Sequence, residues 1–213
     1  MPSVLVRRVI SPPDKLVDDA VAVMVSAMKG GDTAMGALCG GDLTIFPLLA
    51  RAMIREGVIW GEFWTAEENG ELVGFMTWTP PGVEPNIPKD KRAKVNADFV
   101  EALSEEGKAY SRTAIGEDFH NFVAQCVGEK GKDGGWWLRV AMVRPDKQGQ
   151  GIARKLFEPM RRKAAERNEH IACTTTTLRN VEIYKALGFE HRGSHTFPCK
   201  WGDWSLYALY MKP

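Results

Sequence analysis

Residues 148–153 have the composition of an anion-binding loop, Gln-Gly-Gln-Gly-Ile-Ala. They lie between a hydrophobic stretch typical of a strand and an amphipathic stretch typical of a helix. Small residues at Gly149, Gly151 and Ala153 allow a ligand to approach the main chain closely. The first N–H groups of a helix have no partner within the helix and lie at its positive end. We therefore expect this loop to bind an anion, most naturally a phosphate group.

Two common phosphate-binding motifs do not fit this loop. A nucleotide-triphosphatase loop needs a glycine followed by lysine and a hydroxyl residue, which neither Gly149 nor Gly151 has. A dinucleotide fingerprint that begins at Gly149 would place Arg154 where the motif needs a small residue for close packing. A third pattern, Gln/Arg-x-x-Gly-x-Gly/Ala, fits residues 148–153.

In this third pattern the chain resembles the GNAT superfamily of acyl-CoA-dependent N-acetyltransferases, whose members wrap the pyrophosphate of coenzyme A with this loop. Residues 138–145 resemble the family's splayed central strand and the proline that follows it. Residues 180–189 resemble its Asn-x-x-x-Tyr-x-x-x-Gly-Phe helix, and the specific match extends over residues 136–189. The resemblance implies transfer of an acetyl group from acetyl-CoA to a primary amine by direct attack in a ternary complex.

The resemblance also implies roles for the residues at matching positions. The residues expected to bind the phosphates of the donor are Gln148, Gly149, Gln150, Gly151, Ile152, Ala153 and Arg154. The main chain of Met142 and Val143 is expected to pair with the pantetheine arm and to face the thioester oxygen. Tyr184 is the expected acid that protonates the departing thiolate, and its alternative role is that of a core aromatic. Asn180 is the N-cap of its helix, a hydrogen-bonding partner of the pantetheine arm, or both.

Three residues are candidates for the base that takes a proton from the acceptor amine. The predicted central strand has Arg139 where some family members place a carboxylate. Glu62, His120 and His195 could act instead, directly or through water, or could be ordinary polar residues. His191 and His195 would lie about 13 Å apart on a strand at ~3.3 Å per residue, too far to share one metal ion. No metal site is expected.

Residues 80–135 are expected to form a helical insertion and not a separate domain. The segment contains four prolines near its start and two stretches with apolar residues at helical spacing. We expect it to cover the acceptor pocket as a lid that carries Tyr110 and Phe119. Trp78 and Trp201 could line that pocket or, like the other tryptophans, pack in the core.

The hydrophobic pattern predicts the elements that must hold these residues in place. Strands are expected at about 4–10, 58–65, 72–79, 136–143, 171–177, 189–197 and 204–211. Asn69 and Gly70 predict a hairpin between the second and third strands. Helices are expected from Asp14 to a stop at Gly30 and Gly31, at about 43–55 with a stop at Gly57, and at about 149–168 and 180–187. Pro159 falls inside the third of these helices and is expected to remove a hydrogen bond or kink it.

Strands that alternate with helices predict a mixed α/β sheet covered by helices. The resemblance makes this expectation sharper. It implies a mostly antiparallel central sheet with a splayed central strand, helices on both faces and the helical insertion.

The composition indicates a single globular domain that spans residues 1–213. The chain has 44% hydrophobic and 26% charged residues and a net charge of +1. Such a balance gives no general attraction for nucleic acid or for an anionic membrane. The longest apolar run covers about residues 20–25, far short of the roughly 20 residues that a membrane span needs.

The remaining features bear on compartment and partners. The first eight residues show no export signal, and four widely spaced cysteines favour a reducing, cytoplasmic setting. The expected partner is a small-molecule amine, and the chain is expected to be a monomer or a homodimer. Two alternatives stay open. One is a non-catalytic module that binds CoA or acyl-CoA as a sensor or scaffold, and the other is a protein or peptide N-acetyltransferase.

Overall fold

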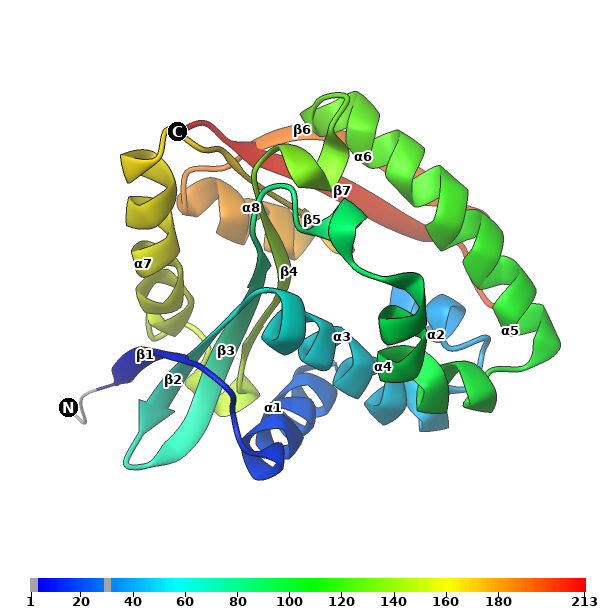
Figure 1. The fold of residues 1–213 in the computed structure, drawn as a ribbon, viewed down its shortest axis with the longest axis horizontal. Helices are drawn as coiled ribbons and strands as arrows, with labels where there is room; N and C mark the ends of the chain where they lie inside the picture. The colour runs from blue at the N-terminus through cyan, green and yellow to red at the C-terminus, as the bar shows by residue number, and fades with distance from the viewer. Residues whose placement is uncertain (1–3, 29–31) are drawn as a thin grey trace.

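The computed structural model describes residues 4–28 and 32–213, which form a seven-stranded sheet in the order β1-β2-β3-β4-β5-β7-β6 (Figure 1). The strands are β1 (Leu5–Val9), β2 (Glu62–Glu68), β3 (Glu71–Thr79), β4 (Trp136–Val143), β5 (Ile171–Thr175), β6 (Glu190–Phe197) and β7 (Trp204–Met211). Every neighbouring pair is antiparallel except β4 and β5, which run parallel. The predicted mixed and mostly antiparallel sheet is confirmed.

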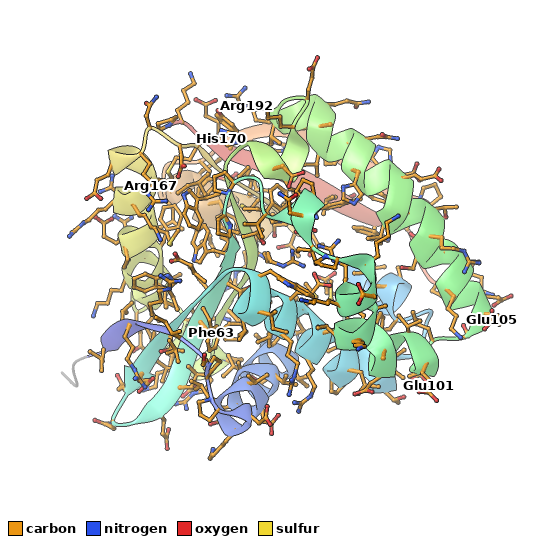
Figure 2. The ribbon with its side chains drawn as sticks, viewed as in Figure 1. Phe63, Glu101, Glu105, Arg167, His170 and Arg192 are labelled. Atoms are coloured by element: carbon orange, nitrogen blue, oxygen red, sulfur yellow. The ribbon has the colours of Figure 1, made fainter. Side chains whose placement is uncertain are left out.

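Helices cover both faces of this sheet (Figure 1). They are α1 (Asp14–Ala27), α2 (Thr33–Leu38), α3 (Phe46–Trp60), α4 (Lys89–Ala102), α5 (Glu105–Tyr110), the π-helical segment η3 (Ser111–Asp118), α6 (Phe119–Val127), α7 (Ile152–Glu166) and α8 (Leu178–Ala186). Side chains of α1, α2, α3 and the insertion share one core, and those of α7 and α8 share the other. Phe63 of β2 lies between the sheet and α1 (Figure 2).

The hairpin predicted at Asn69 and Gly70 is confirmed, because both residues have positive φ angles and join β2 to β3. The helix before it was predicted to end at Gly57, and that prediction was wrong. α3 continues to Trp60, and β2 therefore begins only at Glu62. A side chain at position 57 would collide with Thr77 of β3, so Gly57 lets α3 approach the sheet closely and does not end it.

The helical insertion, residues 80–135, packs on the face that carries α1 and α3. α5, η3 and α6 form one long helical rod that passes along β6 and β7 (Figure 1). Phe99, Leu103, Phe122 and Val123 are buried in the core that also contains α1 and α3 residues. The outer end of the insertion, marked by Glu101 and Glu105 in Figure 2, faces away from the sheet.

The helices α2 and α7 differ from the predicted helices. α2 was not predicted, because six residues are too few to show a helical period. The stop predicted for α1 at Gly30 and Gly31 lies outside the described residues. α7 runs through Pro159 from Ile152 to Glu166 and starts three residues later than predicted.

Among residues 4–28 and 32–213, none of the helices combines the length and the hydropathy that a membrane span requires.

Candidate active site

β4 and β5 separate in the middle of the sheet. Their pairing covers only Trp136 with Ile171, Trp137 with Ala172 and Leu138 with Cys173. On the opposite side of β4, the register with β3 shifts between Thr77 and Trp78, which leaves Arg139 as an extra, bulged residue. A bulge bends its strand and increases its twist. The bulge at Arg139 therefore coincides with the point where β4 leaves β5, and a gap opens beyond it.

The main chain of β4 presents hydrogen-bonding groups to this gap. Arg144 donates its N–H to the Val73 carbonyl of β3 at 2.9 Å. Because successive residues of a strand direct their peptide groups to opposite sides, the peptide groups of Met142 also face β3. Those of Val143 and Ala141 face the gap. Of the two residues expected to meet the pantetheine arm, Val143 is thus the one whose N–H faces the gap, and Ala141, which also faces it, was not foreseen.

The 148–153 loop joins the end of β4 to α7. Gly149 and Gly151 have φ angles of +76° and +77°, a left-handed conformation that favours glycine. The first bond of α7 runs from the Lys155 N–H to the Gly151 carbonyl at 3.1 Å, and no side chain caps the helix. The N–H groups of Ile152, Ala153 and Arg154 precede that bond and have no helical carbonyl to reach. The loop thus has the free amides of an anion site.

The two glutamines of the loop fix its shape. Gln148 Nε2 donates to the Val143 carbonyl at 3.2 Å, and Gln150 Nε2 donates to the Asp146 carbonyl at 3.2 Å. A Cβ atom at Gly149 or Gly151 would meet nothing within 4 Å, so the space above the loop is open. These contacts orient the loop toward the end of β4 and leave room for a ligand.

Two basic residues follow the loop on α7. Arg154 donates from Nη2 to the Ala186 carbonyl at the end of α8, at 3.2 Å. Arg154 and Lys155 also line an open depression of about 690 Å³ between α7 and the side chains of Val4, which precedes β1, and Val6 of β1. Both side chains place positive charge near the start of α7, where it favours a phosphate ligand.

Tyr184 lies on α8 and packs against the core of the α7 face. Its ring meets Phe189 edge-on, with the centroids 5.3 Å apart. Burial raises the pKa of the Tyr184 phenol well above 10, and the nearby Cys173 thiol raises it further. The phenol therefore keeps its proton throughout the neutral pH range. A group in this state can donate a proton to a thiolate but cannot act as a base.

Asn180 is not the N-cap of α8. The cap is Thr177, whose Oγ1 accepts a hydrogen bond from the Asn180 N–H at 3.2 Å. The helix begins two residues before the predicted start because Thr177 has the extended conformation of an N-cap residue. The Asn180 side chain is only half-buried and is free to serve as the predicted partner of the pantetheine arm.

The candidate bases differ in their surroundings. The Glu62 carboxylate is buried and pairs with Lys163 and with Arg8, the latter at 3.3 Å. These pairs make Glu62 a poor base. Burial lowers the pKa of His120, and the positive charge of Lys132 lowers it further, so this imidazole is mainly neutral at pH 7. His195 is exposed on β6 and packs against Phe122, with ring centroids 5.6 Å apart.

Arg139 has carboxylates around it after all, although none lies on β4. We define the Arg139 cluster as Arg139, Glu56 of α3, Glu84, Arg92 of α4 and Lys132. Arg139 pairs with Glu56 and, at 3.0 Å, with Glu84. Glu84 also accepts a hydrogen bond from Lys132 and forms an ion pair with Arg92, each at 2.9 Å. The cluster thus connects the insertion and α3 to the bulge of β4.

Glu84 holds the cluster together, and replacing it should change how stability depends on pH. Burial alone would raise the pKa of Glu84, but Lys132, Arg139 and Arg92 lower it to about 2. A lowered pKa stabilises the fold above the unfolded value, near 4.5, and this stabilisation is lost as pH falls toward 2. We expect the Glu84→Gln variant to be much less stable than the wild type at pH 7. The difference in stability between the two proteins should shrink progressively below pH 5. Urea unfolding across this pH range measures the difference.

Glu158 of α7 provides a matched control. Hydrogen bonds from Arg161 and Arg162 lower its pKa to about 2 as well, but this carboxylate is at the surface. Because exposed ion pairs contribute little, Glu158→Gln should change the unfolding free energy far less. If Glu84→Gln and Glu158→Gln lower the unfolding free energy equally, burial of Glu84 in the cluster does not increase its contribution to stability.

An open depression of about 350 Å³, which we call the cavity, lies on the α1 and α2 face of the sheet. Its lining residues are Asp32, Thr33, Gly36, Gly41, Leu43 and Trp201. The Asp32 carboxylate accepts from the Ala34 N–H at 2.9 Å and from the hydroxyl of Thr176, which directly follows β5. The cavity therefore borders the strand end at which β4 and β5 have already parted.

The two tryptophans proposed for an acceptor pocket have different environments. Trp78 is fully buried against Phe157 in the core of the α7 face, so it lines no pocket. Trp201, in the turn between β6 and β7, lines the cavity and meets the Tyr110 ring edge-on at 5.9 Å. Tyr110 belongs to the insertion and accepts a hydrogen bond from Trp204 Nε1 at 2.8 Å. The insertion therefore reaches the cavity through Tyr110.

A family model described as an acetyltransferase (GNAT) domain matches residues 111–191. The match includes β4, the 148–153 loop, α7, β5 and α8. This part of the chain is therefore similar to a GNAT acetyltransferase domain. The match also covers the second half of the insertion, which has no resemblance by motif. The comparison with curated proteins found no match.

Solved structures share the GNAT fold over the whole chain. A structure described as histone acetyltransferase HPA2 and related acetyltransferase from Corynebacterium glutamicum has TM-score 0.63 and 18% identity, and the alignment covers 100% of this chain and 97% of that one. A polyamine N-acetyltransferase from Drosophila melanogaster has TM-score 0.60 and 11% identity, and the alignment covers 99% of this chain and 100% of that one. The ribosomal-protein-S18-alanine N-acetyltransferase from Escherichia coli has TM-score 0.56 and 10% identity, and the alignment covers 99% of this chain and 94% of that one. At these identities the likeness establishes the fold.

Several residues of this site were beyond the reach of sequence reasoning. Glu56 and Glu84 carry no motif, and only the fold places them on Arg139. Asp32 stands before a helix too short to be predicted. Among the described residues, no group of three or more histidine, cysteine, aspartate or glutamate side chains could hold a metal ion.

Proposed function

We propose that the protein transfers an acetyl group from acetyl-CoA to the primary amine of a small molecule. The observation that carries the proposal is the set of unpartnered amides at residues 152–154, which adjoins the open edge of β4. A diphosphate at the start of α7 would place an extended arm along that edge, where Val143 offers its N–H. Pairing of the arm with β4 would resemble the addition of a strand.

The chemical step follows from these positions. The amine nitrogen attacks the thioester carbonyl, and the new C–N bond forms as the C–S bond breaks. The Val143 N–H stabilises the negative charge that develops on the carbonyl oxygen. Tyr184, which burial keeps protonated, gives its proton to the departing thiolate, and the proton that the amine nitrogen loses as it becomes an amide returns through water to the Tyr184 oxygen. The acceptor reaches the carbonyl from the cavity that Asp32 and Trp201 line.

The size of the cavity supports a small acceptor. A volume of about 350 Å³ lies at the low end of the range for small-molecule sites, and the lining residue Trp201 packs against Tyr110 of the insertion. The structural neighbours include enzymes named for polyamine and for protein acceptors, and do not decide between these classes. The cavity favours the small molecule.

A turnover assay distinguishes this function from a CoA-binding sensor or scaffold and from a protein acetyltransferase. The purified chain is mixed with acetyl-CoA and a panel of small amines, and free thiol and acetylated product are measured by thiol titration and mass shift. We expect turnover with at least one primary amine. Tight binding of CoA without turnover would favour a sensor or scaffold, and turnover only with peptides would favour a protein acetyltransferase.

A further inference from the structure

The cavity combines a fixed carboxylate with an aromatic ring. Asp32 is half-buried, and its two oxygens are oriented by the Ala34 N–H and by the Thr176 hydroxyl. Among the described residues, no lysine or arginine side chain forms an ion pair with it. Trp201 lines the same cavity and already attracts one cation, because Lys200 Nζ lies 5.0 Å from its ring centroid. A carboxylate beside an indole is a favourable environment for an ammonium or guanidinium group.

A nitrogen held by Asp32 is not the nitrogen that reacts. An adjacent negative charge favours the protonated form of an amine, because the two opposite charges attract each other. The attacking amine must be uncharged, so a carboxylate held against it would oppose the reaction. Asp32 therefore suits a group of the substrate that stays positively charged throughout the reaction.

We propose that the acceptor is a diamine, or an amine with a guanidinium group, whose second and positively charged end binds Asp32. The proposal rests on the proposed function, since it assigns the substrate class of the same site. Asp32 borders the end of β5 through Thr176, whereas the proposed donor would hold its carbonyl beside Val143 on β4. A substrate with nitrogens at both ends spans this gap. In this role Asp32 determines specificity and takes no part in the chemistry.

The test compares terminal diamines with monoamines of matched chain length. Acetyl transfer by the full-length wild type is measured for both series, and then by Asp32→Asn. Asparagine is as good an N-cap as aspartate, so the variant keeps the start of α2 while losing the charge. Asp42→Asn is the matched control, because Asp42 caps the next turn through the Thr44 N–H at 2.9 Å and does not line the cavity.

We expect the wild type to prefer a diamine to the matched monoamine. Asp32→Asn should lower kcat/KM for the diamine about 10- to 100-fold, mainly through KM, as expected for a lost hydrogen bond between charged groups. Its kcat/KM for the monoamine and its KM for acetyl-CoA should stay within about 2-fold of wild type, a change too small to be a lost charged contact. Asp42→Asn should behave as wild type with every substrate.

Three results would overturn the proposal. The wild type could show no preference for diamines, Asp32→Asn could have no effect, or it could impair both series equally, as a role at the reacting nitrogen would. Calorimetric titration of the diamines into wild type and Asp32→Asn separates this proposal from the proposed function. If no amine is acetylated but Asp32→Asn weakens diamine binding, acetyl transfer is wrong and the cation site stands. If diamine binding is the same in both proteins, the cation site is wrong.

Discussion

Replacing Gly151 with aspartate is expected to lower the affinity for acetyl-CoA by about 100-fold or more while the protein stays folded. The side chain would have room, since a Cβ atom there meets nothing within 4 Å. Aspartate is also a favourable residue before the first turn of a helix. Its carboxylate, however, would occupy the place of the donor's phosphates and repel them. It would also accept hydrogen bonds from the free N–H groups at the start of α7. Calorimetry with CoA measures the loss.

Gly151→Asn is the control for this experiment. Asparagine has nearly the shape of aspartate and tolerates the left-handed conformation that φ of +77° requires, but it has no charge. We expect it to bind CoA more weakly than wild type and much more tightly than Gly151→Asp. Circular dichroism checks that both variants keep their helices. If the two variants bind CoA equally, charge at the start of α7 is irrelevant and the donor binds elsewhere.

Replacing Tyr184 with phenylalanine is expected to lower kcat about 100-fold, within the range that general acid catalysis supplies. The ring packs against Phe189 and would stay in place, so the KM for acetyl-CoA should change little. Because burial keeps the Tyr184 phenol protonated far above neutral pH, its titration should not appear in the wild-type rate profile below pH 10. Steady-state rates across this pH range provide the measurement.

Tyr210→Phe tests whether the loss is specific to position 184. Tyr210 lies on β7 and packs against His170, with ring centroids 4.9 Å apart, at the paired end of β5. Its hydroxyl should be dispensable for transfer. If Tyr184→Phe keeps the wild-type kcat while turnover persists, the thiolate takes its proton from another donor and Tyr184 is a core aromatic.

The parts of the fold predicted correctly are those decided by local chemistry. Asn69 and Gly70 can adopt positive φ angles, and this alone predicts a tight hairpin. Gly149 and Gly151 adopt the same conformation at the loop before α7. In each case a few neighbouring residues determine the backbone, so no knowledge of the remaining chain was needed.

The errors occurred where distant residues decide the outcome. Gly57 looked like a helix stop, but its missing side chain serves the contact with Thr77, twenty positions away in the sequence. Arg139 does stand on β4 in place of a carboxylate, but its partners Glu56 and Glu84, which are 83 and 55 positions away, were not foreseen. No local pattern encodes such a pairing, because the partners meet only after the sheet and the insertion have formed.

The short pairing between β4 and β5 also affects the order of events in a catalytic cycle. The 148–153 loop, which we propose binds the donor, lies on the α7 face of the sheet, and the cavity beside Asp32, which we propose binds the acceptor, lies on the α1 face. A break in the sheet between them gives each substrate a separate entrance. Neither molecule needs to arrive first or wait for the other to depart, so random addition is the kinetic scheme that this architecture permits.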